Sequence, residues 1–454
     1  MLCIGLALGL GAGFLVGLSG RWLNMPVAEA AAEAAAERTD PPSQRYSRYD
    51  KLSSFARSLA IVEREYVLPV DGEALVEGAM RGMVDSLDPH TTYLPPDEAK
   101  MLLEDIDGTF GGVGIVVSLR TAETGRLQLE VLEVLAGGPA LAEGIFAGDV
   151  IVGIEGRPVA QYVDLFEAIA TMRGRIGTAV HFSIERAGAE PRDVTLTRAR
   201  IESEAVTFER LPDDIGVIRL RDFQAQSTSQ IRKALKTLDA EGTGGVTGVI
   251  LDLRDNGGGL LGEAIGVADL FLSRGVIVKT RGRQGVLMSH ARASAPRTYA
   301  KIPMVVLINK GSASASEIVA AALQDHGRAA IVGERSYGKG SVQTPHYLPN
   351  GGMLKLTTAL YYSPRDRVIQ AAGVMPDIIA DGTPVGRGDT RPEIVPEDQV
   401  EGHLEPAEFG REGAASPSTT PPADEQQATE VVDVDASQLE AAVAQVKLIR
   451  KLQR

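Results

Sequence analysis

The spacing of apolar residues divides the chain into three regions of different period. Between about Tyr46 and Asp105 the apolar positions recur at helical spacing, interrupted by the proline-containing loop LDPHTTYLPPDEA at 87–99. From about Asp107 to Arg200 the period falls towards two, which predicts strands bounded by glycine turns, with one helical stretch among them. From about Val206 to Asp381 the apolar runs VTGVILDLR and IPMVVLIN each precede a helical segment. That alternation predicts an α/β-layered structure.

The first twenty residues carry no charged side chain and are about long enough to span a bilayer. Glycines recur at every fourth position from Gly5 to Gly17, which places them on one helix face, as in closely packed membrane helices. A secretory signal peptide is the alternative, because VAEA at 27–30 has the small residues of a cleavage site. We favour a retained anchor, and both interpretations predict export.

The two ends of the globular region have a different composition. Residues 28–45 are rich in Ala, Glu and Pro and are expected to form a tether, whereas residues 382–436 have the composition of a disordered acidic linker. The last stretch opens on a possible N-cap, Ser437, and ends in basic residues, as a terminal helix does.

Composition narrows the possible partners. Hydrophobic residues make up 44% and charged residues 23% of the 454 residues, as in ordinary globular proteins. The net charge of -14 argues against binding to nucleic acid, which needs basic patches. The single cysteine, Cys3, excludes an intramolecular disulfide and a cysteine metal cluster.

The stretch GSASASE at 311–317 lies between an apolar strand and a helix, so it is the turn that joins them. Ser314 and Glu317 have the spacing of a capping box, which gives the turn a purely structural explanation. The same position also suits a nucleophile, because unpaired amides at a helix N-terminus can hold an oxyanion.

A nucleophilic serine needs a base. Each of the six histidines is more typical of a solvated or packed side chain, and His326 lies at the far end of the helix, out of reach. Lys339, in GERSYGKGSVQT, can serve if burial lowers its pKa. An ordinary exposed turn lysine is the alternative. A phosphate loop is excluded because Gly340 follows the lysine, where Ser or Thr is required.

Gly257, Gly259 and Gly262 match the dinucleotide-binding pattern GxGxxG, but a single match of this kind is weak evidence. The next strand, VIVKTRGR, does not end in the acidic residue that would bind a ribose. Close approach of the backbone to a substrate carbonyl would explain these glycines equally well.

Taken together, LDLRDNGGG, NKGSASASEIVAAALQDHGRA, VGERSYGKGSVQT and GVMPDI resemble the carboxyl-terminal processing (tail-specific) proteases, the serine-lysine peptidase family S41. The resemblance covers about residues 46–381. It implies a multidomain α/β (α+β) fold with N-terminal helices, an inserted β-rich PDZ domain and an α/β-layered protease core of the crotonase or ClpP type. The expected segments are an anchor or signal at 1–20, a tether at 21–45, a helical region at 46–106, a PDZ domain at 107–200, a core at 201–381, a linker at 382–436 and a helix at 437–454.

The resemblance also implies the roles of individual residues. Ser314 would be the nucleophile and Lys339 its base, with Gln343 orienting the amine. The oxyanion would be held by backbone amides of Ala315 and of the glycine run, Gly258 and Gly259. No metal and no other cofactor is implied.

GTFGGVGIVV at 108–117 resembles the PDZ loop that holds a peptide carboxylate while the peptide adds a strand to the sheet edge. Arg173, in TMRGRIG, matches the arginine by which related enzymes sense bound peptide; a solvated helix-end cation is the alternative. The implied substrate-binding residues are Gly111, Gly112, Val113, Gly114, Ile115 and Arg173. One departure from the family is Asp366 in PRDRVIQ, where a glycine is usual.

The expected function is that of a serine endopeptidase of the cell envelope or periplasm, anchored to the inner membrane by residues 1–20. It would bind apolar carboxyl-terminal tails of proteins and cleave through an acyl-enzyme. A homodimer and an activating adaptor or lipoprotein are expected as partners, and nucleic acid is not. A catalytically inactive PDZ scaffold is the alternative from another class, and a dinucleotide-binding enzyme is a weaker one.

Overall fold

The computed structural model describes residues 48–121, 127–162, 165–202, 204–240, 245–294, 298–380, 394–405 and 434–453. The chain divides into two compact units, Met1–Leu75 and Val76–Arg454, which are described separately. Helix α2 (Arg48–Glu65) belongs to the first, and α3 (Gly72–Asp85) crosses the boundary. Within the described ranges no helix is long and apolar enough to cross a membrane. The expected anchor at 1–20 and tether at 21–45 lie outside them.

A six-stranded sheet forms the centre of the larger unit. Its strand order is β10-β11-β12-β15-β16-β19, antiparallel between β10 and β11 and parallel elsewhere. Strands β12 and β15 are buried along their whole length, which explains why their sequences are continuous apolar runs. The bounds are β10 Val206–Leu211, β11 Ile215–Leu220, β12 Gly248–Asp252, β15 Met304–Ile308, β16 Ala330–Gly333 and β19 Ile378–Ile379.

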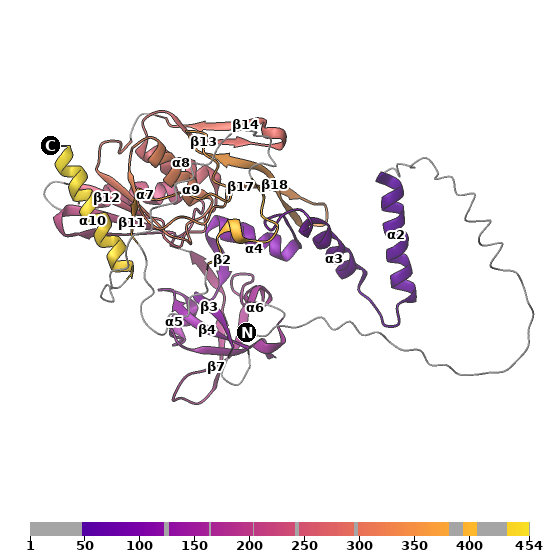
Figure 1. Cartoon of the computed structure of the whole chain (residues 1–454). Helices are drawn as coiled ribbons and strands as arrows, with labels where there is room; N and C mark the ends of the chain where they lie inside the picture. Colours follow the sequence, from indigo (N-terminus) through magenta and orange to yellow (C-terminus); the bar gives the residue numbers. More distant parts are fainter. Residues whose placement is uncertain are drawn as a thin grey trace, which may run out of the picture. The chain divides into compact units, whose positions relative to one another are not determined.

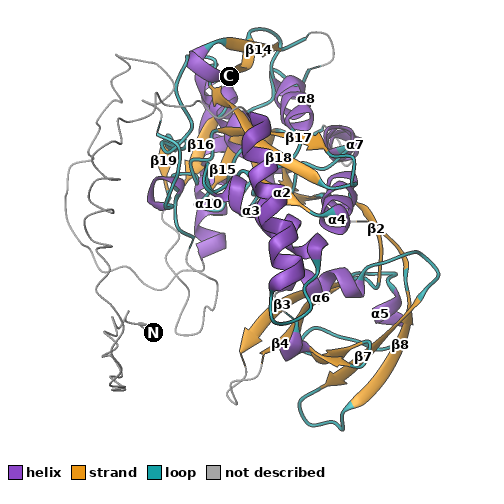
Figure 2. Ribbon diagram, turned by 90° about the vertical axis from the view of Figure 1, so that its right-hand side faces the viewer, coloured by secondary structure: helices purple, strands orange, loops and turns teal. Residues whose placement is uncertain are grey.

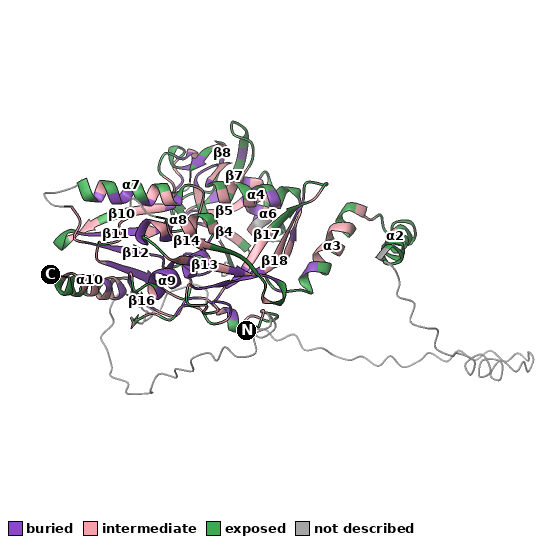
Figure 3. Ribbon diagram, turned by 90° about the horizontal axis from the view of Figure 1, so that it is seen from above, coloured by how far each residue is buried: buried purple, intermediate pink, exposed green. Residues whose placement is uncertain are grey.

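Helices cover both faces of this sheet (Figure 1). Alternate residues of β12 point to opposite sides: Val249 and Leu251 join the cluster with α7, α8 and α9, and Ile250 joins the cluster with α10. Helix α9 is buried almost throughout (Figure 3). The fold class expected from the sequence, α/β layers combined with helical and β-rich parts, is confirmed. The helices are α7 Ser227–Ala240, α8 Leu261–Phe271, α9 Ala315–Asp325 and α10 Val434–Leu452.

A second sheet extends from the core. Its order is β1-β18-β13-β14, and β17 also pairs with β18. Through β1, the loop LDPHTTY is joined to β18, with Thr92 opposite Lys355. The bounds are β1 Thr92–Leu94, β13 Val276–Arg281, β14 Leu287–Arg292, β17 Ser341–Tyr347 and β18 Met353–Tyr362.

The β-rich part between Asp107 and the core has a sheet of its own with the order β3-β4-β5-β7-β8, in which β6 also pairs with β5 (Figure 2). Strand β3 is at the edge of this sheet. Strands β2 and β9 pair separately. The elements are α4 Pro96–Asp107, β2 Thr109–Gly112, β3 Ile115–Thr121, β4 Leu127–Val134, α5 Pro139–Ala142, β5 Val150–Ile154, β6 Arg157–Pro158, α6 Leu165–Met172, β7 Ala179–Glu185, β8 Arg192–Thr197 and β9 Ala199–Glu202.

The expectation of a disordered linker over 382–436 is wrong for residues 394–405. This stretch contains a 3-10 turn, η4 (Glu397–Gln399), and Glu397 is completely buried. The polar composition of this stretch gives no indication that it is ordered. Glu397 is held by hydrogen bonds to residues distant in sequence, and not by apolar neighbours. Helix α10 begins at Val434, so Ser437 is inside it and is not its N-cap.

Candidate active site

Ser314 occupies the tight turn between β15 and α9. Its φ is +54°, which is rare for a residue other than glycine and stores strain. Such a turn from strand to helix lifts a serine hydroxyl out of the surrounding backbone. The neighbouring serines are buried and fix the turn: Ser312 Oγ donates to the Leu253 carbonyl (2.8 Å) and Ser316 Oγ to the Asn256 carbonyl (2.9 Å).

Gly258 lies directly against Ser314. Its φ is +112°, and a Cβ placed on it would be 2.9 Å from Ser314 Cβ and 3.1 Å from the Ala315 nitrogen. Only glycine fits this approach. The Gly258 amide donates to Asn256 Oδ1 (2.9 Å) within its own loop. A Cβ on Gly259 would instead overlap the Phe223 carbonyl, so the two glycines contact different neighbours.

Glu317 joins the serine turn to the lysine turn. Its Oε2 accepts hydrogen bonds from the amides of Ser314 (2.7 Å) and Lys339 (2.9 Å). Its Oε1 accepts from the Gly338 amide (2.7 Å) and from Ser336 Oγ (2.5 Å). The side chain is fully buried, and burial raises the pKa of Glu317 to about 7, opposed by these four hydrogen bonds. The expected cap partner therefore organises both turns.

Lys339 is partly buried among charged groups. Burial lowers the pKa of Lys339, and the positive charge of Lys355 lowers it further. Carboxylates of Glu397, Asp88 and Glu317 act in the opposite direction. A larger fraction of the amine is thus neutral, and able to accept a proton, than for an exposed lysine. The exposed-turn interpretation of this residue does not fit its surroundings.

Gln343 lies near the beginning of β17, two residues after Ser341. Its Nε2 donates to Thr357 Oγ1 (2.7 Å) on β18 and to Ser341 Oγ (3.3 Å). Thr357 Oγ1 in turn donates to Asp88 Oδ1 (3.0 Å). The glutamine is thereby connected to the loop LDPHTTY, while its expected contact with the lysine amine stays a prediction.

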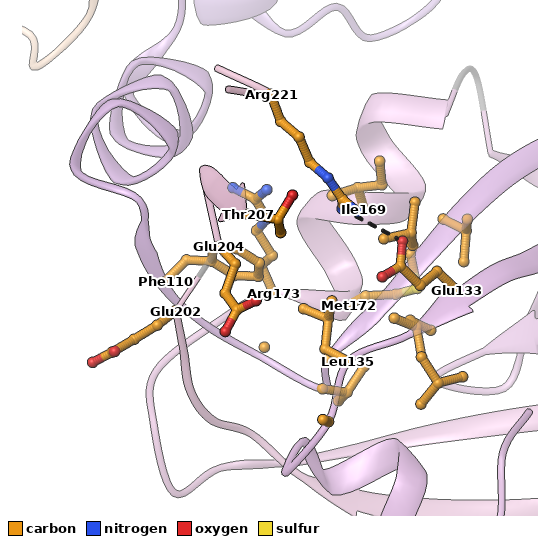
Figure 4. Close-up of a pocket in the computed structure, with 18 residues that line it drawn as sticks. Phe110, Glu133, Leu135, Ile169, Met172, Arg173, Glu202, Glu204, Thr207 and Arg221 are labelled. Carbon is orange, nitrogen blue, oxygen red and sulfur yellow. Dashed lines mark ion pairs between the residues drawn. The ribbon is translucent and has the colours of Figure 1, made fainter. Parts of the chain in front are cut away.

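A cavity of about 560 Å³ opens beside the edge strand β3 (Figure 4). Five of the six expected substrate-binding residues line it: Gly112, Val113, Gly114, Ile115 and Arg173. The sixth, Gly111, packs against the end of α6, where its carbonyl accepts from the Gly174 amide (3.0 Å).

Arg173 is not a solvated cation. Its guanidinium lies 4.0 Å from the centre of the Phe110 ring and pairs with Asp105 on α4 (2.7 Å), and its side chain is only 16% exposed. Asp222 lies in the same region, and burial together with the charge of Asp105 raises the pKa of Asp222 to about 6. A second ion pair, Arg221 with Glu133 (3.7 Å), crosses the cavity rim (Figure 4).

Four residues near the lysine were not identified from sequence as site residues: Glu317, Asp88, Lys355 and Glu397. Only the capping-box spacing and the proline-containing loop gave any signal, and neither indicates contact with Lys339. His90, expected to be solvated or simply packed, donates from Nε2 to Glu397 Oε2 (2.8 Å).

Comparison with known proteins identifies the class. The model for peptidase family S41 matches residues 214–380, the PDZ domain model matches 111–197, and the model for the activating protease CtpB N-terminal domain matches 14–98. The chain therefore belongs to the carboxyl-terminal processing proteases of peptidase family S41, and the expected family and enzyme class are confirmed.

Several relatives can be compared over most of their length. The carboxy-terminal-processing protease of Bartonella bacilliformis is 38% identical over 82% of this chain and 85% of its own. The carboxy-terminal processing protease CtpA of Bacillus subtilis is 33% identical over 74% of this chain and 69% of its own. Among solved structures, photosystem II D1 C-terminal processing protease is 32% identical, covering 71% of this chain and 86% of that one, with a TM-score of 0.45.

Proposed function

We propose that Ser314 is the nucleophile and Lys339 the general base of a serine-lysine peptidase. The observation that carries this proposal is the Glu317 carboxylate, one oxygen of which accepts from the amides of both residues. The lowered pKa of Lys339 and the strained turn at Ser314 support the same roles.

In the first half of the reaction, Ser314 Oγ attacks the scissile carbonyl carbon as neutral Lys339 takes the hydroxyl proton. The amide of Ala315, at the first position of α9, and the amide of Gly259 would stabilise the oxyanion. The Gly258 amide, expected from the sequence to do the same, donates to Asn256 Oδ1 instead. Lys339 then gives the proton to the leaving amine, and the C–N bond breaks to leave an acyl-enzyme. Lys339 deprotonates water, which attacks the ester carbonyl; the bond to Ser314 Oγ breaks, and Lys339 returns the proton to that oxygen. Gln343 would orient the amine from β17.

The PDZ domain fits the binding of carboxyl-terminal protein tails. We propose that an apolar tail adds a strand to the free edge of β3, with its carboxylate at the amides of Val113–Ile115 and its side chains in the adjoining cavity. Support comes from the apolar lining given by Ile169 and Met172 of α6. Arg173, at the end of that helix, would link tail binding to α4 through Asp105.

Bacterial processing proteases are among the relatives. We propose that this chain is exported and tethered in the cell envelope or periplasm by residues 1–20, because these residues lack charge. A homodimer, an adaptor or lipoprotein that activates it, and the expected domain limits, apart from the linker at residues 394–405, are part of the same proposal.

The test uses an unfolded model protein with an apolar tail, incubated with the full chain and with Ser314→Ala and Lys339→Ala. Mass spectrometry is expected to find fragments with the wild type alone, while Ser314→Ala still binds the tail peptide. Tail binding without fragments from any of the three, also when envelope extract supplies an activating partner, would contradict the proposal and support the inactive scaffold. Arg173→Gln is expected to reduce the amount by which an apolar tail on the substrate increases cleavage.

A further inference from the structure

Residues 394–405 form a segment that we call the strap, and its 3-10 turn, η4, packs against the turn that contains Lys339. The Glu397 amide donates to the Tyr337 carbonyl (3.0 Å), and Glu397 Cβ is 3.5 Å from where a Cβ on Gly338 would be. At the outer side of η4, Asp398 pairs with Arg335 (3.2 Å). The strap therefore contacts the backbone of Tyr337 and the side chain of Arg335, the two neighbours of Ser336, which lies three residues before Lys339.

The Glu397 carboxylate connects two segments that are far apart in sequence. Oε2 accepts from His90 Nε2 (2.8 Å) in the loop LDPHTTY. Glu397 Oε1 accepts from the Gln370 side-chain nitrogen Nε2 (2.7 Å). Gln370 Oε1 in turn accepts from the Gly340 amide (2.9 Å). The Glu397 carboxylate is thus connected to Gly340, the residue after Lys339, through the side chain of Gln370 alone. Gly340 packs closely against Gln370, because a Cβ on Gly340 would overlap the backbone nitrogen of Gln370.

Burial of a carboxylate at zero exposure costs several kcal/mol unless it is paired and hydrogen-bonded. Burial raises the pKa of Glu397, but the bonds from His90 and Gln370 and the charges of His90 and Lys339 outweigh burial and hold the pKa below its ordinary value. Glu397 is therefore an anion whose charge acts on Lys339. An apolar side chain of similar size would fill the same space without the free-energy cost of burying a charge. The presence of a carboxylate here therefore points to a role beyond packing.

We propose, on the basis of the proposed serine-lysine mechanism, that Glu397 is a positioning residue: it fixes the Lys339 turn through Gln370 and Tyr337, and its charge sets the pH range in which Lys339 accepts a proton. The charged groups that act on Lys339 come from four segments of the chain. They are Glu397 of the strap, Asp88 of the loop LDPHTTY, Glu317 of α9 and Lys355 of β18. Lys355 is the only cation among these four, and Glu397 acts against it.

Variants of Glu397 test its charge and the length of its side chain separately. Glu397→Gln keeps the size but removes the charge, so Lys339 loses a proton more easily and the acid limb of the kcat/KM profile moves to lower pH. Glu397→Asp keeps the charge but shortens the side chain, so the acid limb stays and kcat falls by ~10-fold or more because the turn is no longer fixed. Glu397→Ala is expected to lower kcat by ~100-fold with little change in KM.

The matched control is Glu401→Gln, which removes the same charge from an exposed position of the strap. It is expected to leave kcat and the acid limb unchanged. An acid limb that stays in place in Glu397→Gln, or moves equally in both variants, would overturn the role of the charge. Wild-type kcat in Glu397→Asp and Glu397→Ala would overturn the positioning role.

A second measurement does not depend on cleavage. The NMR titration of [13C]methylated Lys339, assigned with Lys339→Arg, is expected to occur at lower pH in Glu397→Gln than in the wild type. Thermal unfolding of each variant identifies any that do not fold. If Glu397→Ala is among them, the fall in kcat of Glu397→Asp still tests the positioning role. If the wild type cleaves nothing, the proposed function fails, while an unshifted Lys339 titration in Glu397→Gln separately refutes the inference.

Discussion

The backbone amides of Ser314 and Lys339 donate to the same oxygen of Glu317, over 2.7 and 2.9 Å. The two residues come from different turns, one before α9 and one before β17. A shared acceptor fixes the distance between these turns without using either functional side chain. Neither the hydroxyl of Ser314 nor the amine of Lys339, the groups proposed to react, takes part in these two hydrogen bonds.

Glu317→Gln tests this arrangement. Glu317 accepts all four of its hydrogen bonds, two at each carboxylate oxygen. Glutamine has an NH₂ group in place of one of these oxygens, so two of the four donors would meet another donor and lose their acceptor. We expect the free energy of unfolding to fall by about 2–3 kcal/mol and kcat to fall by ~10-fold or more. Urea unfolding and cleavage kinetics measure both. Glu209→Gln, at an exposed position of β10, is the control, and equal effects of the two variants would refute the role of Glu317.

Gly258→Ala is expected to abolish cleavage while the protein still folds. The new methyl group would lie 2.9 Å from Ser314 Cβ, and φ of +112° is unfavourable for alanine. Gly262→Ala is the control: it lies in α8, has open space around the Cβ position, and is expected to stabilise the protein by up to ~1 kcal/mol. Full activity of Gly258→Ala would show that the glycine run does not border the reacting groups.

The parts of the fold that follow from local patterns were predictable. Strands β12 and β15 are continuous apolar runs because both faces are buried. The roles proposed for Ser314 and Lys339 rest on motif resemblance. The burial of Glu397 could not be predicted in this way. Its neighbours in sequence are polar, and its stabilising partners, His90 and Gln370, come from distant segments. His90 was expected to be solvated or packed, and its contact with Glu397 could not be predicted for the same reason.

Asp149 is expected to stabilise the PDZ domain in a pH-dependent way. Hydrogen bonds from Arg186 (2.5 and 2.7 Å) lower the pKa of this carboxyl, helped by the Phe146 amide, although burial opposes them. A lowered folded pKa gives stability that is present above the unfolded value of 3.8 and is lost as pH falls through the folded value.

At pH 7, Asp149→Asn is therefore expected to lower the free energy of unfolding of the PDZ domain by about 1–3 kcal/mol. The difference from the wild type should begin to shrink as the pH falls below the unfolded value of 3.8, and should go on shrinking until Asp149 is protonated in the folded state as well. Glu190→Gln, exposed in the same domain, provides the control. A difference that stays constant from pH 7 to pH 3 would mean that the ion pair with Arg186 is not its source.

Lys355→Met is expected to move the acid limb of the kcat/KM profile to higher pH. Lys355 disfavours the protonated form of Lys339, so removing the charge raises the pKa of Lys339 and leaves less neutral amine at a given pH. The direction is opposite to that expected for Glu397→Gln, because the two side chains present opposite charges to one amine. Lys310→Met, whose side chain is 62% exposed in the wild type, is the control and should not move the limb. Combining Lys355→Met with Glu397→Gln should return the limb towards its wild-type position; a double variant that follows either single variant would mean that one of the two charges does not act on Lys339.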